Sequence, residues 1–465
     1  MRAGFRVIFY LFLLALLISS LQLLRLALQK PLPQDVISHA QLAQDLQHLQ
    51  RQLRRYSAFG AIYPERLGRI EQHIQQLQAR YPQHITLNRF NTEVRKLISL
   101  LQDPGGSVSA PPFTTRQLPL TLQKMQQQWL ALDGHHPLDS QRPFISHIDG
   151  LPMGQWLAAA QRMLWPGQPL SRQLQQLQTL RQELGLPLKD QVIITLEGPR
   201  MAPRNITLPL ADNAVANALS PPAMSQWQWL DSHTQLLRLT QLDRLEIDPQ
   251  LRRDVKKALG ANTLILDLRQ AKGSSQLLLQ WLAPGRQHPA TQPMGYARYH
   301  RSARLRNDFL SPLGFMPVRQ FRLFPPITAA LAAQPHPLLS PWFARPSPVL
   351  PPAPAAPQQR LVLLIGHDCR EECEWLAHSA KQWRHTLLMG EATAGDMGRK
   401  YNVRLPASGI QLRFSASLAY DKYGNLLSGK GTSPDLPLAL PPQAPWDSLL
   451  DALQQHFLAA SQSRH

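Results

Sequence analysis

Apolar residues recur at helical spacing in the first hundred residues after the amino-terminal segment. In each of three groups an apolar side chain returns every three or four positions, which places it on one face of a helix. The groups run over residues 42–53, 67–77 and 90–101. Pro64 and Pro82 separate them, and the run Asp103-Pro104-Gly105-Gly106 ends the region. The pattern predicts three short amphipathic helices over residues 31–110 and disfavours a coiled coil, which needs longer unbroken repeats.

The pattern is mixed between residues 111 and 212. Phe144 to Gly150 and Gln191 to Leu196 are rich in the β-branched and apolar residues typical of strands, and residues 153–164 between them favour a helix. We therefore expect a small α+β module here.

A third region, residues 213–445, contains short, continuous apolar runs. Thr263 to Leu268 and Arg360 to Ile365 are of the kind found in strands covered on both faces, and helix-forming sequence follows each of them. This order predicts an α/β core with parallel strands and crossover helices. Apolar and polar residues alternate from Ile410 to Leu418, which predicts one half-exposed strand before a turn at Tyr423-Gly424-Asn425.

Two segments fall outside this pattern. Residues 334–358 are dense in proline, which donates no backbone hydrogen bond, so we expect an extended surface insertion rather than helix or sheet. Residues 446–465 carry apolar positions at helical spacing between Asp447 and Leu458 and predict a short terminal helix.

The amino terminus is long and apolar enough to enter a membrane. Val7 to Leu24 is almost wholly apolar and follows Arg2 and Arg6, within a segment of residues 1–30. No small-x-small cleavage site follows it, which favours an uncleaved signal anchor. Basic residues before the apolar run tend to stay in the cytoplasm. We expect a single-pass protein of the bacterial inner membrane with its bulk in the periplasm; the alternative is secretion to the periplasm after signal cleavage.

Charge points to an anionic neighbour. The chain has 49 Lys and Arg against 30 Asp and Glu, a formal net charge of +19. These charges are scattered, without the basic clusters or zinc-finger spacing of nucleic-acid binding proteins. The sequence therefore predicts no nucleic-acid partner, and a basic surface facing anionic lipid headgroups accounts for the charge. No metal-ligand or cofactor motif is present.

The chain has only two cysteines, Cys369 and Cys373. In an oxidising compartment they could form a local disulfide, because four residues of separation keep their Cα atoms close enough. They could equally be two small buried residues on one helical turn. The sequence leaves this choice open.

Three motifs occur in an order that resembles a known family. The run Asp267-Leu268-Arg269 to Ser274 is similar to its Asp-Leu-Arg-Gly-Asn-x-Gly-Gly turn, and Cys369 to Glu374 leading to Gly390-Glu391-Ala392-Thr393-Ala394-Gly395 resembles its nucleophile helix and the strand end after it. Tyr423 to Asp435 resembles its Gly-Lys-Gly-x-x-Pro-Asp closing motif. The chain is thus identified as resembling the tail-specific (C-terminal processing) serine peptidases.

The resemblance implies a crotonase- or Clp-protease-like core of stacked β-β-α units, a helical cap over residues 31–110 and a PDZ-like module over residues 111–212. The residues that carry the family's fold motifs are Asp267, Arg269, Gly273, Gly390, Glu391, Thr393, Gly395, Gly429, Gly431, Pro434 and Asp435.

The residues expected to do the chemistry depart from the family pattern. The nucleophile serine is expected twenty residues before Glu391, and Glu371 stands there. One branch of the family has a base lysine where this chain has Asp396, and another has a histidine in an Asp-x-His turn where this chain has Asp103-Pro104-Gly105. A carboxylate cannot form an acyl ester by losing a hydroxyl proton, and it repels a developing oxyanion. We expect Glu371 and Asp396 to lie near each other and to pair with arginines such as Arg370 or Arg399.

The sequence therefore predicts a scaffold without peptidase activity that binds a peptide or protein tail. The alternative is a divergent serine- or cysteine-type peptidase in which Cys373, or a distant serine, is a displaced nucleophile; no base is identified for such a thiol. A third hypothesis is a structural partner in an envelope assembly that docks through the proline-rich insertion.

Overall fold

The computed structural model of the chain describes most of the region between residues 36 and 437. The described residues are 9–10, 12–21, 36–109, 116–133, 136–166, 168–211, 225–230, 232–286, 293–303, 310, 314–318, 335–347 and 359–437. The predicted terminal helix from Asp447 to Leu458 lies outside them.

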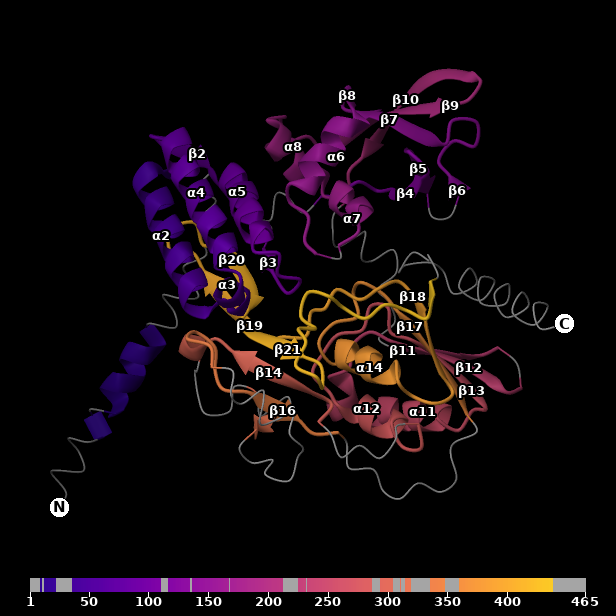
Figure 1. Cartoon of the computed structure of the whole chain (residues 1–465). Coiled ribbons are helices and arrows are strands. Elements are labelled where there is room, and N and C mark those ends of the chain that lie inside the picture. The colour runs from indigo at the N-terminus through magenta and orange to yellow at the C-terminus, as the bar shows by residue number, and fades with distance from the viewer. Residues whose placement is uncertain are drawn as a thin grey trace.

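Three parts are visible in Figure 1: a helical cap, an α+β module and an α/β core. The cap contains the predicted amphipathic helices and one short extra helix that ends before Pro64. Its elements are β1 (Val36–Ser38), α2 (His39–Tyr56), α3 (Ala58–Ile62), α4 (Pro64–Arg80), β2 (His84–Thr86) and α5 (Leu87–Leu100).

Local chemistry fixes where the cap helices begin. The Ser38 hydroxyl accepts the Gln41 backbone N–H, and the Gln41 side chain accepts the Ser38 N–H, so two otherwise unsatisfied donors at the start of α2 are bonded. Pro64 occupies the first turn of α4, where its missing N–H costs nothing. The buried Asp45 carboxylate of α2 accepts the backbone N–H groups of Ala407 (2.7 Å) and Ser408 (2.8 Å), which ties the cap to the core.

The α+β module is built on an antiparallel sheet in the order β10-β9-β7-β5-β4, with β6 and β8 at its margins. Its predicted strands are present as β7 and β9, and the helix predicted near residues 153–164 is α6. The module contains β4 (Thr121–Met125), β5 (Gln128–Asp133), β6 (His136–Pro137), β7 (Phe144–Ile148), β8 (Leu151–Pro152), α6 (Met153–Gln161), α7 (Leu170–Gln175), α8 (Leu177–Leu184), β9 (Gln191–Gly198) and β10 (Met201–Pro209).

Charged residues join the module to its neighbours. The buried Lys96 amine of α5 lies 2.7 Å from the Glu93 carboxylate and 2.9 Å from that of Glu183 in α8. Two nitrogens of Arg172 in α7 each lie 2.6 Å from an oxygen of Asp368 in the core. The Lys96 pairs are largely shielded from solvent, so they contribute more to positioning than exposed ion pairs would, whereas the Arg172 side chain is 36% exposed.

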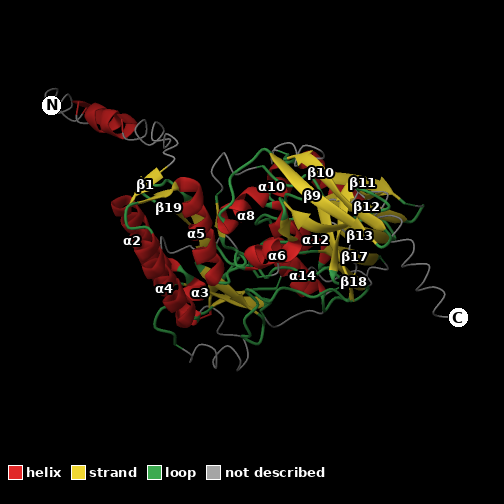
Figure 2. Cartoon of the chain, turned by 90° about the horizontal axis from the view of Figure 1, so that it is seen from above, coloured by secondary structure: helices red, strands yellow, loops and turns green. Residues whose placement is uncertain are grey.

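The main core sheet runs β11-β12-β13-β17-β18-β22, with every pair parallel except β11 and β12. The two apolar runs are its centre, β13 and β17, as predicted. In Figure 2 these strands lie side by side with helices packed along them. The elements are β11 (Ser225–Trp229), β12 (Thr234–Leu239), α10 (Arg244–Ile247), α11 (Pro249–Ala258), β13 (Thr263–Asp267), α12 (Leu277–Leu282), β17 (Arg360–Ile365), α14 (Glu372–Ala380), β18 (Thr386–Gly390) and β22 (Leu436–Pro437).

Two smaller sheets join the core to the cap. One has the order β19-β20-β3 and the other β15-β16-β14-β21. Their strands are β3 (Ser107–Val108), β14 (Gly295–Tyr299), β15 (Met316–Pro317), β16 (Phe343–Arg345), β19 (Lys400–Arg404), β20 (Gln411–Ser415) and β21 (Ser417–Tyr420), and a 3₁₀ turn, η2 (Arg301–Ala303), follows β14.

The prediction of one half-exposed strand from Ile410 to Leu418 was wrong. The chain changes sheets at Ala416, and both serines beside it are buried at 2% exposure. Ser415 donates to a buried carboxylate and the Ser417 hydroxyl accepts the Arg399 N–H, so these polar side chains are bonded without facing water. The turn after β21 is present: the Asp421 carboxylate accepts the N–H groups of Tyr423 and Asn425.

The prediction that residues 334–358 form only an extended surface insertion was also wrong. Phe343–Arg345 forms β16 between β14 and β15, with Ala344 and Arg345 almost completely buried. These three residues contain no proline, so their N–H groups can join the sheet, while Pro341 and Pro346 flank them. Residues 348–358 lie outside the described part.

Residues 9–10 and 12–21 are helical, and most of their large apolar side chains are exposed by about half. Within the part of the chain that the structure describes, no helix combines the length and the apolar character that crossing a membrane requires. Part of the predicted span Val7 to Leu24 lies outside the described residues.

Candidate functional site

The candidate site lies where the parallel core strands end. The loops after β12, β13, β17 and β18 all leave the carboxyl edge of the sheet, because these strands run in the same direction. In open α/β sheets ligands bind at this edge. The fold-motif residues from Asp267 to Gly395 lie at the ends of β13 and β18 or on the loops after them, and those from Gly429 to Asp435 lie on the segment between β21 and β22.

Asp267 at the end of β13 anchors the first loop. Its carboxylate is 3% exposed and accepts two hydrogen bonds from the Arg269 guanidinium, both at 2.9 Å, and one from Arg238 at 2.8 Å. Burial alone would raise the pKa of Asp267, but the bonds and charge of Arg269 and Arg238 outweigh it and lower the pKa. The Asp-Leu-Arg motif therefore fixes the loop.

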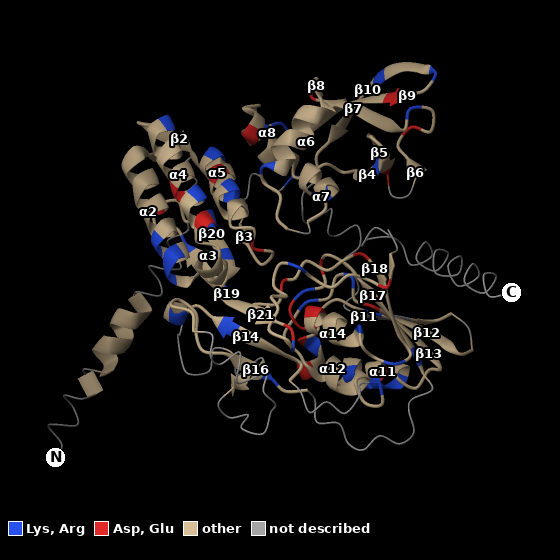
Figure 3. Cartoon of the chain, viewed as in Figure 1, with Lys and Arg blue, Asp and Glu red and all other residues tan. Residues whose placement is uncertain are grey.

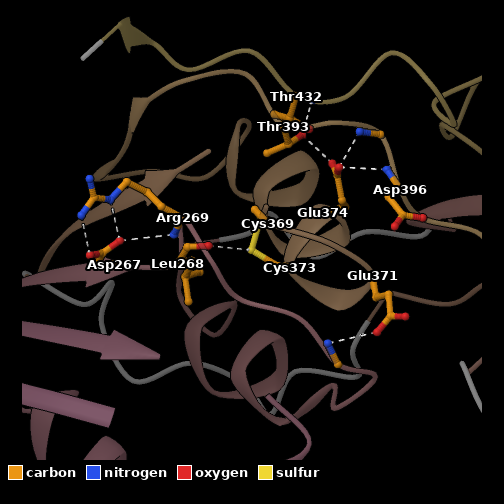
Figure 4. Close-up of a disulfide and its surroundings, with 12 residues drawn as sticks. Asp267, Leu268, Arg269, Cys369, Glu371, Cys373, Glu374, Thr393, Asp396 and Thr432 are labelled. Atoms are coloured by element: carbon orange, nitrogen blue, oxygen red, sulfur yellow. Dashed lines mark hydrogen bonds and ion pairs between the residues drawn. A yellow bond between two sulfur atoms is a disulfide. The ribbon is translucent and has the colours of Figure 1, made fainter. Parts of the chain in front are cut away.

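Glu371 stands at the start of α14 in a backbone conformation that is unusual for a side-chain-bearing residue (φ +59°, ψ −115°). Its carboxylate accepts the backbone N–H of Gly273 at 3.0 Å (Figure 4). Its own N–H donates to the Asp396 carbonyl at 2.8 Å. The Glu371 side chain therefore occupies the Gly273 N–H, a donor that could otherwise bind an anion.

Glu374, one turn into α14, organises the loop after β18. Its fully buried carboxylate accepts the Thr393 hydroxyl and the Gly395 N–H, both at 2.5 Å, and the Asp396 N–H at 3.0 Å. Burial raises the pKa of Glu374 to about 7, against the lowering effect of these bonds. Sequence analysis did not single this residue out.

Two loops approach each other so closely that only glycine fits. A Cβ on Gly395 would lie 2.6 Å from the Gly429 nitrogen, and one on Gly431 would lie 2.0 Å from the Thr393 carbonyl oxygen. Both glycines have positive φ. The Thr432 N–H donates to the Thr393 hydroxyl at 2.7 Å, which joins the loops further.

The remaining fold-motif residues, Gly390, Glu391, Pro434 and Asp435, lie in or next to β18 and β22. A Cβ on Gly390 would lie 2.2 Å from the Ile365 carbonyl, and the Glu391 N–H donates to that same carbonyl. Asp435, which follows Pro434, accepts the Leu388 N–H at 3.0 Å and pairs with Lys381 at 2.6 Å. All of these contacts stabilise the loops, and none supplies a reactive group.

Asp396 is buried and paired with cations. Its carboxylate contacts the Lys400 amine of β19 and lies 3.4 Å from an Arg370 nitrogen. Burial would raise the pKa of Asp396, but the Lys400 and Arg370 charges outweigh it and hold the pKa below its ordinary value. The expected pairing with Arg370 is present, and sequence analysis missed Lys400.

The turn at residues 103–105 meets this pair from the cap side. Asp103 accepts the Ser415 hydroxyl at 2.7 Å and the Gly105 N–H at 2.9 Å. A Cβ on Gly105 would lie 2.4 Å from Lys400 Cε and 2.8 Å from an Asp396 oxygen. The two positions at which the resemblance predicts a base, 105 and 396, therefore adjoin the same space, and Lys400 fills it. Burial raises the pKa of Asp103 in spite of its bonds to Ser415.

Cys369 and Cys373 form a disulfide with a Cα separation of 5.2 Å, and both are completely buried. This outcome resolves the choice that the sequence left open. A disulfide sulfur is not a thiolate, so in this state Cys373 cannot be a nucleophile.

The structure places Glu371 and Asp396 beside each other through their backbones, as expected, although their carboxylates have different partners. Arg399 contacts Ser417 through its backbone N–H. His367, which sequence analysis missed, lies 3.4 Å from Asp368 after β17. Lys400 had one weak signal, its position four residues after Asp396. Among the described residues no group of three or more His, Cys, Asp or Glu could hold a metal ion.

A cleft of about 930 Å³ opens beside these loops, where the cap, the module and the core meet. Its walls include Pro104 and Gly106 from the cap turn, Trp165 from the module, and His367 and Arg370 from the core. Arg370 lines the cleft and pairs with Asp396, so the candidate site adjoins the cleft.

The profile of peptidase family S41 matches residues 234–438. The crystal structure of mature CPAF is similar with a TM-score of 0.58 and 15% identity, over 89% of this chain and 96% of that chain. Mature CPAF complexed with lactacystin gives a TM-score of 0.58, 16% identity and coverage of 90% and 98%. The photosystem II D1 C-terminal processing protease is less similar, with a TM-score of 0.40, 13% identity and coverage of 86% and 94%.

No curated protein sequence matches the chain. The likeness to CPAF establishes a common fold, and the matched profile covers the β12–β22 core with all of the fold-motif residues. The chain is thus similar to peptidase family S41 over residues 234–438, and it shares the fold of mature CPAF.

Proposed function

We propose that this protein is a non-catalytic member of the S41 family that binds peptides or protein tails in the cleft between cap, module and core. The observation that carries the proposal is the Glu371 carboxylate. It stands at the family's nucleophile position and accepts the Gly273 N–H at 3.0 Å. An acyl-enzyme needs a hydroxyl or thiol there and a free donor for the oxyanion.

The surroundings of Glu371 support the same proposal. Asp396 and Gly105 stand at the family's base positions, and the nearby amine, Lys400, is paired with the buried Asp396 carboxylate. The Lys400 amine is thus engaged by a carboxylate and not by a nucleophile.

The alternative, a divergent peptidase, would need a nucleophile elsewhere. Cys373 is a poor candidate because it is buried and disulfide-bonded. Ser415 is opposite Lys400 in the sheet, but its hydroxyl donates to Asp103 and is 2% exposed. Both features support the scaffold over the enzyme.

The retained α+β module supports a binding role, since we propose that it acts as a PDZ-like unit to which an extended peptide can add as a strand. The exposed apolar side chains of residues 12–21 support a membrane anchor, with the folded part in the periplasm. An envelope protein is a suitable partner for such a chain.

The experiment is to incubate the full-length protein, in mild detergent, with an unstructured protein and with a fluorophosphonate or thiol-reactive probe. We expect binding without cleavage and without labelling. Time-dependent cleavage that persists in Glu371→Ala and disappears in Cys373→Ala would establish the cysteine peptidase instead. Cleavage that persists in both variants would place a nucleophile elsewhere in the chain and contradict the proposal.

A further inference from the structure

The cleft walls carry an excess of positive charge. Six basic residues line it against two acidic residues, Asp243 and Asp368, which leaves a formal excess of four. The basic residues are Arg95, Arg172, Arg244, Lys272, Arg370 and Arg413. Figure 3 shows Lys, Arg, Asp and Glu positions interspersed on the loops beside α14.

Three of the six basic residues are already paired with carboxylates. Arg172 makes a two-pronged contact with Asp368, with both N···O distances 2.6 Å. Arg370 lies between Asp368 and Asp396, at 3.5 and 3.4 Å. Arg244 lies 3.0 Å from Asp248.

The other three form no ion pair among the residues that the structure describes, although the charge of Arg413 also acts on the buried Asp396 carboxylate. Arg95 is 8% exposed, and its guanidinium donates to neutral acceptors: Gln176 at 2.6 Å, Val108 at 3.2 Å and Asn91 at 3.3 Å. Burial lowers the pKa of Arg95 to about 10, so it remains charged at neutral pH. A buried cation without a counter-ion is unfavourable, and an incoming anion would relieve it.

Arg413 and Lys272 extend this charge along the cleft. Arg413 stands opposite Ser107 in the β20–β3 pair, one residue from the Val108 carbonyl that Arg95 contacts. Its buried Nε makes no hydrogen bond. Lys272 lies on the core side, after β13, and is exposed. An extended ligand in the cleft would thus meet a cation on the cap side and another on the core side.

We propose that the cleft selects acidic polypeptide segments, whose side-chain carboxylates neutralise Arg95, Arg413 and Lys272. This inference rests on the proposed peptide-binding function and gives it a ligand class. A polypeptide is favoured over other polyanions because the cleft combines these cations with the side chains of Trp165 and Ile247, which suit the apolar parts of a peptide. The Ile247 side chain in the cleft wall is 74% exposed.

The test compares three peptides of equal length, acetylated and amidated so that no terminal carboxylate contributes. They differ only in carrying Glu, Gln or Lys at alternate positions. Binding to the full-length protein is measured by fluorescence anisotropy at about 50 and 200 mM salt, with heparin and a DNA oligonucleotide as competitors. We expect the Glu peptide to bind at least tenfold more tightly than the Gln peptide, with a smaller ratio at the higher salt concentration.

Two variants with the same loss of charge form a matched pair. Lys272→Gln should weaken binding of the Glu peptide severalfold and leave binding of the Gln peptide unchanged. Lys257→Gln, an exposed lysine on α11 outside the cleft walls, should change neither. Arg413→Gln should weaken binding further, and its melting temperature shows whether the fold is intact.

Each outcome decides between the two proposals. Equal binding of the Glu and Gln peptides would overturn the acidic selectivity and leave the peptide-binding function standing. Absence of binding to all three peptides would overturn both. Tight binding of heparin or DNA with no binding of the Glu peptide would show a polyanion site and overturn the assignment to polypeptides.

Discussion

The glycine-rich loops and the acidic residues beside them lie at the same edge of the core sheet. The glycines allow close backbone packing, whereas the acidic side chains pair with donors and cations. In the loops, Gly395 and Gly431 allow a backbone approach of the kind that the S41 motifs suggest. At the reactive positions, Glu371 and Asp396 are engaged by a backbone donor and by cations. The same edge of the sheet therefore combines a glycine-dependent backbone framework with carboxylates that make ordinary stabilising contacts.

The largest expected effect is in the loops. Gly431→Ala would place a Cβ 2.0 Å from a backbone carbonyl at a φ of +69°, so the loops must separate. We expect a loss of at least about 4 kcal/mol in the free energy of unfolding, measured by urea denaturation. Gly68→Ala is the control: its Cβ meets nothing within 4 Å in α4, and we expect a gain of about 0.5–1 kcal/mol.

The next effect tests the buried ion pair. Lys400→Met removes the nearest cation from the buried Asp396 carboxylate and leaves only the more distant Arg370 and Arg413, and we expect a loss of about 3 kcal/mol. The double variant with Asp396→Asn should be more stable than the sum of the single losses predicts, because it removes both charges. A double-mutant cycle measures this coupling, and strict additivity would contradict the pairing.

A smaller effect should appear as a dependence of stability on pH. Folding raises the pKa of Glu374 from 4.5 to about 7, so the stability it contributes is fully present below pH 4.5 and is lost as pH rises to 7. We expect this group alone to lower the free energy of unfolding by about 2–3 kcal/mol across that window. The Gln side chain of the Glu374→Gln variant does not titrate. The difference in the free energy of unfolding between wild type and this variant should therefore change with pH as Glu374 titrates. A constant difference from pH 4.5 to 7 would show that Glu374 titrates normally.

Much of the core could be predicted from the sequence because its signals are local. The apolar runs of β13 and β17 identify buried parallel strands, and the order of the three motifs predicts the family whose model matches residues 234–438. The prediction for the proline-rich segment was wrong because this segment contains a three-residue strand, Phe343–Arg345. Its strand partners are far away in the sequence, and the high proline content gave no local signal for it.

The cleft could not be predicted, because its contacts join distant segments. Arg172 and Asp368 are 196 residues apart, and Asp103 and Ser415 are 312 apart. Nothing near either residue indicates its partner. The reactive positions were predicted by analogy with family motifs, which located Glu371 and Asp396 but gave no indication that Lys400 fills the space beside Gly105.

The smallest effect separates the two roles of position 371, its charge and its backbone. Glu371→Gly and Glu371→Ala both remove the carboxylate from the Gly273 N–H, but only glycine adopts φ +59° and ψ −115° without strain. We expect the glycine variant to be more stable than the alanine variant by about 1 kcal/mol in urea denaturation. Glu371→Gln, which keeps an acceptor for the same N–H, should remain within about 1 kcal/mol of wild type. Equal stability of the glycine and alanine variants would show that the turn relaxes when the carboxylate is removed. In that case the bond from Gly273 to Glu371, rather than the surrounding framework, maintains the backbone conformation at the nucleophile position.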